Sequence, residues 1–260
     1  MLRTVTATRY VTPLREGGSL PALVEADDDG LYVLKFRGAG QGPLALVAEL
    51  VAGEIGRALG LPVPELVLME VGVELGRNEP DPEIRELLKA SIGCNLALDY
   101  LPGSVMFDPA AGDSLAAELA SEIVWFDALV TNVDRTPRNP NLLLWHRAPY
   151  LIDHGAALYF HHAWQNVEEM AKTRFAAVRE HVLLPWASRL EEAGERLPAL
   201  LPAARLAAIL DEVPDAWLRA APGDLTPAGR RAGYLAFLTG RLAAARAFVE
   251  EAERARAQLV

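Results

Sequence analysis

Two polar loops in the middle of the sequence each place an aspartate beside an apolar run. The first loop carries Asp134, then Asn139 and Asn141, and leads into the apolar letters LLLW. The second loop follows the apolar letters PYLI and holds Asp153, with Gly155 two residues later. A glycine at that point would let the backbone turn close to a metal ion. The two apolar runs predict a short hairpin that has one aspartate on each side.

These residue types suit the transfer of a phosphoryl group. One carboxylate, that of Asp134, would orient the attacking hydroxyl or accept its proton. An asparagine and Asp153 would hold Mg²⁺ on the phosphates of ATP, because this cation prefers oxygen ligands. Either loop taken alone is equally well explained as a turn or as the ordinary end of a strand. The two loops together favour the chemical interpretation.

The elements that would position these loops change character along the chain. The first third contains short apolar runs, VTATRYV, PALVEA and LYVLKF, separated by the turn signals EGGS and DDDG. This pattern predicts antiparallel strands. Residues 44–60 then show apolar positions at helical spacing, and two further strand-like runs follow. The sequence becomes mainly helical near Pro102 and Gly103.

The second part of the chain carries clear helix signals. Ser114 is the predicted N-cap of a helix that runs to Val130 and leads directly to the first polar loop. Thr226, followed by Pro227, is predicted to cap a last helical run that extends as far as Phe248. We therefore expect an α+β fold with a strand-rich beginning and a helical end.

The letters VDRTPRNPNLLL, followed by LIDHG, resemble the catalytic and metal-binding loops of HipA-like kinases. The Asp-Arg pair is also similar to the loop of phosphoinositide kinases. The resemblance covers most of residues 10–185 and implies a bilobal, protein-kinase-like fold. A β-rich, ATP-binding N-terminal lobe would comprise residues 1–101, and a mostly helical catalytic lobe residues 102–260.

The resemblance assigns roles to further residues and leaves one choice open. Asn132 and His154 depart from ordinary protein kinases, which have a histidine and a phenylalanine at these positions, and both fit the HipA-like form better. For the metal-binding asparagine, Asn139 has the usual spacing of five from the catalytic aspartate. Asn141 directly precedes the apolar strand, as the family's asparagine does, and we slightly favour it.

By the same resemblance, Lys35 should grip the nucleotide phosphates and Glu49 should hold Lys35 in place. The residue pattern agrees, because Lys35 is the one cation at the end of an apolar strand and a buried lysine needs a partner. The alternative is a lysine that lies along a strand edge with its ammonium group in water. Glu54 is a rival partner, and we favour Glu49.

The segments that would contact the rest of the nucleotide are less specific. The EGGS turn, with Gly17, Gly18 and Ser19, could cover the phosphates through its backbone N–H groups, although paired glycines also make plain hairpin turns. The segment RGAGQG at 37–42 competes for this role, but it follows the lysine strand, where kinases place no phosphate cover. The adenine would lie against backbone groups near Asp99, Tyr100 and Leu101.

Composition excludes several other classes of protein. The 260 residues carry a net charge of −10, and no basic stripe is present to meet a nucleic acid. Cys94 is the single cysteine, so an internal disulfide or a CxxC metal site is excluded. His161 and His162 would point to opposite sides of a strand, which argues against zinc. No apolar run of about 18 residues is found, so we expect a cytoplasmic protein that does not span a membrane.

These observations lead to a function and two alternatives. We expect an ATP- and Mg²⁺-dependent phosphotransferase, a Ser/Thr protein kinase of the HipA-like type, in which Asp134 positions the acceptor hydroxyl. The alternatives are a small-molecule kinase of the aminoglycoside-phosphotransferase type, and a nucleotide-binding pseudokinase or interaction module. All the expected catalytic positions are filled, which argues against the pseudokinase. The acceptor, the oligomeric state and any antitoxin-like partner stay open at this point.

Overall fold

The computed structural model describes residues 2–14, 20–77, 79–164, 166–221 and 223–259. Its N-terminal part is a small, closed β-barrel with the strand order β1-β2-β3-β5-β4. Neighbouring strands are antiparallel except β1 and β4, which pair in parallel. The strands are β1 (Thr4–Pro13), β2 (Ala22–Ala26), β3 (Leu31–Lys35), β4 (Leu66–Val71) and β5 (Gly93–Asp99).

Side chains inside the barrel alternate with outward-facing ones along each strand, because successive residues point to opposite faces. Val5, Val24, Leu34 and Met69 are among the inward-facing residues, and all are buried. The strands that the sequence predicts in this part of the chain are confirmed. A short helix, α2 (Pro82–Ala90), is inserted between β4 and β5. The Asp81 carboxylate caps this helix by accepting from the backbone N–H of Glu83 at 2.9 Å.

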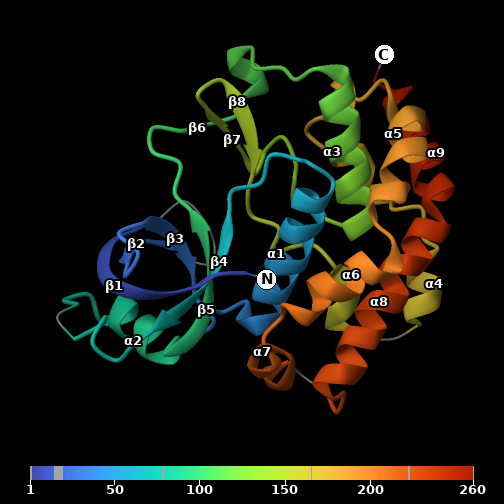
Figure 1. The fold of residues 1–260 in the computed structure, drawn as a ribbon. Coiled ribbons are helices and arrows are strands. Elements are labelled where there is room, and N and C mark those ends of the chain that lie inside the picture. The colour runs from blue at the N-terminus through green and yellow to red at the C-terminus, as the bar shows by residue number, and fades with distance from the viewer. Residues whose placement is uncertain (1, 15–19, 78, 165, 222, 260) are drawn as a thin grey trace.

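The longest helix of this part, α1 (Gly42–Ala58), lies between the barrel and the helical part of the molecule (Figure 1). It is buried along most of its length, because the barrel covers one side and C-terminal helices cover another. Gly56 allows this close packing: a Cβ atom there would lie 3.0 Å from Val63 Cγ2 and 3.5 Å from Phe126 Cζ. The position of α1 matters because it carries Glu49.

The C-terminal part is mostly helical and holds a small sheet in the order β6-β7-β8. Its strands are β6 (Val105–Met106), β7 (Leu142–Trp145) and β8 (Ala148–Leu151). Its helices are α3 (Ala117–Val130), α4 (Val167–Ala171), α5 (Leu190–Arg196), α6 (Ala203–Asp211), α7 (Asp215–Ala220), α8 (Pro227–Ala243) and α9 (Ala245–Arg256). Short 3₁₀ turns lie at Pro109–Ala111, Tyr159–His162, Ala176–Glu180, Leu184–Trp186 and Leu197–Leu200. In the described ranges, no helix has the length and apolar character that crossing a membrane would require.

Two predicted helix ends are placed differently by the structure. The prediction that Ser114 caps α3 is wrong: the N-cap is Ala116, and residues 113–116 have no regular secondary structure. Leu115 packs against the core while Ser114 stays exposed. Thr226 does cap α8, accepting from the Gly229 N–H at 3.1 Å. The last run is interrupted at Ala244, however, so Phe248 lies on the separate helix α9.

The helices α6 and α7 bind the N-terminal part to the rest of the molecule. Trp217 on α7 is fully buried, and its indole N–H donates to the carbonyl oxygen of Cys94 on β5 at 3.0 Å. The Glu212 carboxylate, just after α6, accepts from the backbone N–H of Leu2 at 2.9 Å. The barrel and α1 are thus held against helices that come from the end of the chain.

We expect Trp217→Ala to lower the free energy of unfolding by about 3–5 kcal/mol, because it removes a fully buried aromatic side chain. Trp217→Phe should cost less, about 1 kcal/mol for the lost hydrogen bond plus a small packing loss. Urea unfolding monitored by circular dichroism measures both values. Val73→Ala, at an exposed site, is the control and should change little. Equal stability of Trp217→Ala and wild type would contradict this docking.

Candidate active site

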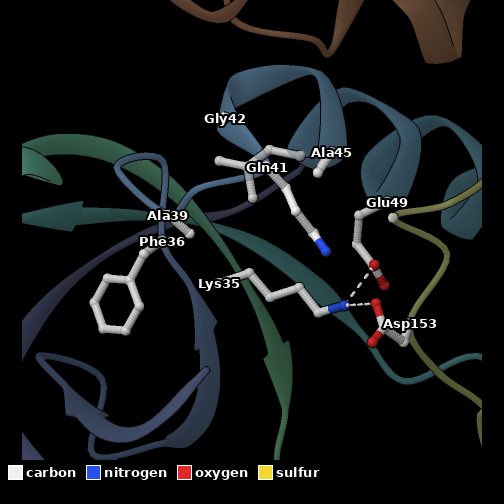
Figure 2. Close-up of a pocket in the computed structure, with 10 residues that line it drawn as sticks. Lys35, Phe36, Ala39, Gln41, Gly42, Ala45, Glu49 and Asp153 are labelled. Carbon is white, nitrogen blue, oxygen red and sulfur yellow. Dashed lines mark hydrogen bonds and ion pairs between the residues drawn. The ribbon is translucent and has the colours of Figure 1, made fainter. Parts of the chain in front are cut away.

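The ammonium group of Lys35 contacts two carboxylates from distant parts of the chain. Lys35 ends β3, and its Nζ lies 2.6 Å from Glu49 Oε2 on α1 and 2.6 Å from Asp153 Oδ1 in the loop after β8 (Figure 2). The Glu49 side chain is completely buried, whereas 41% of the Asp153 side chain is exposed. The cluster therefore has a closed end at Glu49 and an open end at Asp153.

The Glu49 carboxylate has a second set of contacts with the loop that carries Asp153. Its Oε2 accepts from the backbone N–H of His154 at 2.8 Å, and its Oε1 lies 3.4 Å from His154 Nδ1. The buried His154 ring packs edge-on against Phe126 with centroids 5.7 Å apart. Glu49 thus connects α1 to β3 and to the loop after β8 through a single side chain.

The pairing determines the charges of this cluster. Burial by itself raises the pKa of Glu49, but Lys35 and the His154 side chain outweigh it and lower that pKa to about 2. Burial likewise lowers the pKa of Lys35, and the attraction of Glu49 and Asp153 reverses the effect, so this pKa lies above its ordinary value. The rival Glu54 pairs with Arg57 at 3.2 Å instead.

Asp134 lies in the loop between α3 and β7, where both candidate asparagines contact it. Asn139 Nδ2 donates to Asp134 Oδ2 at 2.7 Å, and Asn141 Nδ2 is 3.4 Å from the same oxygen. The backbone N–H of Asp134 donates to Asn132 Oδ1 at 3.2 Å. The loop therefore holds the Asp134 carboxylate by one oxygen. Because both asparagines use their nitrogens here, their amide oxygens remain available to a cation.

The strands β7 and β8 form the predicted hairpin, which sets the distance between the two loops. Just beyond the last pair, Leu142 and Leu151, the Ile152 N–H donates to the Asn141 carbonyl oxygen at 3.0 Å. Asn141 and Asp153 have φ values of 47° and 55°, in the left-handed region that Asn and Asp tolerate better than most residues. The left-handed turn is thus at Asp153 itself, whereas the sequence suggested Gly155.

A buried network that sequence reasoning missed supports the Asp134 loop from below. Asp127, near the end of α3, lies 2.5 Å from Arg135 Nε and 2.9 Å from His181 Nε2. Asn132 Nδ2 also donates to the Asp127 carboxylate at 2.9 Å. All four side chains are buried. Two features of the sequence point to this network: an aspartate, Asp127, lies within an apolar helix, and an arginine directly follows Asp134.

The Arg135 guanidinium links the two functional loops. Besides Asp127, it donates to the backbone carbonyl oxygen of Asn141, and a weaker contact of 3.5 Å reaches the carbonyl oxygen of Ile152. Burial opposes the negative charge of Asp127, but Arg135 and His181 outweigh it and keep the Asp127 pKa below its ordinary range. Burial lowers the pKa of His181. Arg135 is thus a positioning residue for both loops.

A cleft of about 500 Å³ opens beside the Lys35 cluster. Lys35 and Asp153 line one end of it. Apolar side chains contribute to its walls, among them Val33, Leu98, Leu143 and Ile152. The three residues that the sequence associates with adenine also line it, namely Asp99, Tyr100 and Leu101. The structure therefore brings these three residues into one cavity with Lys35 and Asp153.

Of the two glycine-containing segments that the sequence offers as phosphate covers, only the segment 37–42 is described by the structure. Gly17, Gly18 and Ser19 of the EGGS turn lie outside the described residues. The segment 37–42 does reach the cluster, because Gln41 and Gly42 line a small second cavity together with Lys35, Glu49 and Asp153 (Figure 2).

The histidines that were weighed for zinc lie in a 3₁₀ turn rather than a strand, so the predicted strand geometry is wrong. His161 is buried with its Nδ1 2.9 Å from the Tyr234 hydroxyl oxygen. Burial lowers its pKa to about 3. Within the described ranges, no group of three His, Cys, Asp or Glu side chains is placed to hold a metal ion.

We expect acid to remove the stabilisation that Glu49 contributes. Its pKa is about 2 in the folded protein against an ordinary value of 4.5. The contribution is complete above the ordinary value and is lost as the pH falls toward the folded value. The free energy of unfolding should therefore fall as the pH is lowered from 4.5 to about 2. The slope of this free energy against pH should be shallower in Glu49→Gln. Urea titrations at several pH values measure it, and the exposed Glu74→Gln is the control. Parallel slopes in Glu49→Gln and wild type would refute the assignment.

We expect Arg135→Ala to lower the free energy of unfolding by about 3–5 kcal/mol, since it leaves Asp127 buried without its partner. Adding Asp127→Asn removes the unpaired buried charge. The free energy of unfolding of the double variant should therefore fall by less than the sum of the decreases in the two single variants. Arg189→Ala, which breaks only exposed ion pairs, should cost no more than about 1 kcal/mol. Additive losses in the double variant would show that the two side chains are not coupled.

The fold of this chain is similar to that of a solved kinase structure. The crystal structure of the Helicobacter pylori proinflammatory kinase CtkA is similar with a TM-score of 0.60 at 13% identity, covering 100% of both chains. The Golgi casein kinase structure is matched at a TM-score of 0.45 and 12% identity, over 98% of this chain and 74% of that one. No curated protein matches the sequence. A sequence model of the HipA-like kinase family matches residues 8–236, which span both the barrel and the helical part. The chain therefore belongs to the HipA-like kinase family and is a kinase.

Proposed function

We propose that the chain transfers the γ-phosphate of ATP, with Mg²⁺, to a Ser or Thr hydroxyl of a protein. The observation that carries this proposal is the double contact of the Lys35 ammonium with Glu49 and Asp153, each at 2.6 Å, beside an open cleft. A buried lysine held by one buried carboxylate keeps its charge and its position. Such a lysine is suited to bind phosphate oxygens.

The cleft suits the base of the nucleotide. Its walls carry apolar side chains that can cover the faces of an adenine ring. The N–H groups of Asp99 and Tyr100 already donate to other backbone carbonyl oxygens, so the backbone at Leu101 is the group proposed to pair with the ring edge. The phosphates would extend from there to Lys35. On this proposal residues 1–101 form the nucleotide-binding lobe and residues 102–260 the catalytic lobe.

The side chains around the two loops fit Mg²⁺ by their chemistry. Asp153 is partly exposed and uses only Oδ1 for Lys35. The amide oxygens of Asn139 and Asn141 are not engaged by Asp134, because their nitrogens make those contacts. Oxygen donors of this kind are the ones that Mg²⁺ accepts in phosphoryl-transfer sites. The bound cation would neutralise charge on the phosphates.

Asp134 is the proposed catalytic residue for the acceptor. Its carboxylate is half-buried and is oriented through Oδ2, so Oδ1 can accept a hydrogen bond from the attacking hydroxyl. The buried Asp127 and Arg135 pair keeps the loop fixed beneath it. Catalysis then rests on orientation and charge neutralisation rather than on a covalent intermediate.

We expect Asp134→Asn and Asp153→Asn to fail at different steps. Asp134→Asn should keep its affinity for Mg–ATP and lose about 100-fold or more in phosphoryl transfer, because only the acceptor hydroxyl is affected. Asp153→Asn should lose the Mg²⁺ dependence of nucleotide binding as well as transfer. Calorimetry with a non-hydrolysable ATP analogue and autophosphorylation with labelled ATP measure the two steps.

Asp211→Asn, at an exposed position far along the chain, is the matched control and should behave as wild type. Undiminished transfer by Asp134→Asn would remove that residue from the proposed role. Wild-type protein that phosphorylates only metabolites, and never protein, would replace the protein acceptor by a small molecule.

A further inference from the structure

Two cavities meet at the Lys35 cluster, and they share Lys35 and Asp153. The larger one extends toward Leu101, which the proposed function assigns to the base. The smaller one is lined by Gln41, and residues near the start of α1 form its other wall. A nucleotide that enters from the larger cleft passes Lys35 and Asp153 before it reaches the smaller cavity. Its last phosphate is therefore the group that comes nearest to Gln41.

The loop before α1 places the Gln41 side chain over this cavity. The Ala39 N–H donates to the Phe36 carbonyl oxygen at 3.2 Å, and the Gly42 N–H donates to the Ala39 carbonyl oxygen at 2.8 Å. Gly42 has a φ of 68°, a conformation that glycine adopts without steric cost. These two turns reverse the chain so that Gln41 stands at the first turn of the helix.

Gln41 is exposed, so its side chain needs no hydrogen-bond partner within the fold. Gln41 occupies the N-cap position of α1, but its side chain makes no capping hydrogen bond. No hydrogen bond from its amide to another described residue is found. Figure 2 shows the side chain extending from the loop toward the Lys35 ammonium and the Asp153 carboxylate. A polar group with hydrogen-bonding capacity is thus directed at the point where the phosphates would lie.

The surroundings favour an anion at this point. The Lys35 ammonium lies in the same cavity with its partners Glu49 and Asp153, and the first turn of α1 contains no acidic side chain. On the proposed function, Mg²⁺ held by Asp153 would offset these carboxylates and so allow a phosphate to bind here. The amide of Gln41 is neutral, so it can donate to a phosphate oxygen without competing with Lys35 for Asp153. The amide would also distinguish nucleotides by their length, because only a nucleotide that extends beyond Lys35 would reach it.

We propose that the Gln41 amide donates a hydrogen bond to the terminal phosphate of bound ATP and so distinguishes the triphosphate from the diphosphate. This inference rests on the proposed function and adds a residue to it. The position of segment 37–42 after the lysine strand argues against a phosphate contact when the sequence is considered alone. In the structure, the turn at Gly42 brings it back to the same lysine.

The test compares the binding of two nucleotides to Gln41→Ala by calorimetry in the presence of Mg²⁺. The affinity for a non-hydrolysable ATP analogue should fall about 10-fold, as expected for a lost hydrogen bond to a charged group. The affinity for ADP should stay within about 2-fold of wild type, because ADP does not reach Gln41. Gln41→Glu keeps the shape of the side chain and adds a negative charge, so it should weaken the ATP analogue more than Gln41→Ala does.

Gln258→Ala, the same substitution at an exposed site beyond α9, is the control and should bind both nucleotides as wild type does. Equal affinities of Gln41→Ala and wild type for the ATP analogue would overturn the inference alone. Equal losses of affinity for ADP and for the ATP analogue in Gln41→Ala would also overturn the inference. Gln41 would then support the Lys35 cluster rather than contact the last phosphate. A wild-type protein that binds neither nucleotide would overturn the proposed function itself.

Discussion

The buried carboxylate of Glu49 is the constraint on which the rest of the site depends. A charge with no exposed surface costs several kcal/mol unless it is fully paired. Its partners come from β3 and from the loop after β8, and the contact with His154 spans 105 residues of sequence. The barrel, α1 and the β7–β8 hairpin must all be correctly placed before this carboxylate is satisfied. The requirement to pair one charge therefore fixes the geometry around Lys35 and Asp153.

A second buried charge has the same effect on the other side of the hairpin. The Asp127 carboxylate pairs with Arg135 and His181, and Arg135 also donates to backbone carbonyl oxygens of both functional loops. Asp134 and Asp153 adjoin these two buried clusters and are both partly exposed. The site thus combines a desolvated framework with accessible carboxylates. On the proposed function this arrangement suits a reaction that depends on orientation, because the contacts of the framework hold each carboxylate by one oxygen.

The docking of α7 and the turn at Gly42 show how the helical part and the barrel share one site. Trp217 holds the barrel from outside through the Cys94 carbonyl oxygen, while α1 presents Glu49 on its buried side. The loop before α1 then places Gln41 over the small cavity at the Lys35 cluster (Figure 2). Because Gln41 is the N-cap residue of α1 and Glu49 lies within the same helix, any movement of α1 would shift both together.

The sequence by itself determined the features that depend on local patterns. These include the strand-rich beginning, the α1 helix, the Thr226 cap and the two loops with Asp134 and Asp153. The resemblance to HipA-like kinases implied the pairing of Lys35 with Glu49, and the need of a buried lysine for a partner agreed with it. Only the tertiary structure decided the network of Arg135, the approach of Gln41 and the start of α3 at Ala117. Each of these depends on a backbone reversal or on a partner distant in sequence. His181, for example, lies 54 residues from its partner Asp127. Patterns that span only a few residues cannot indicate such partners.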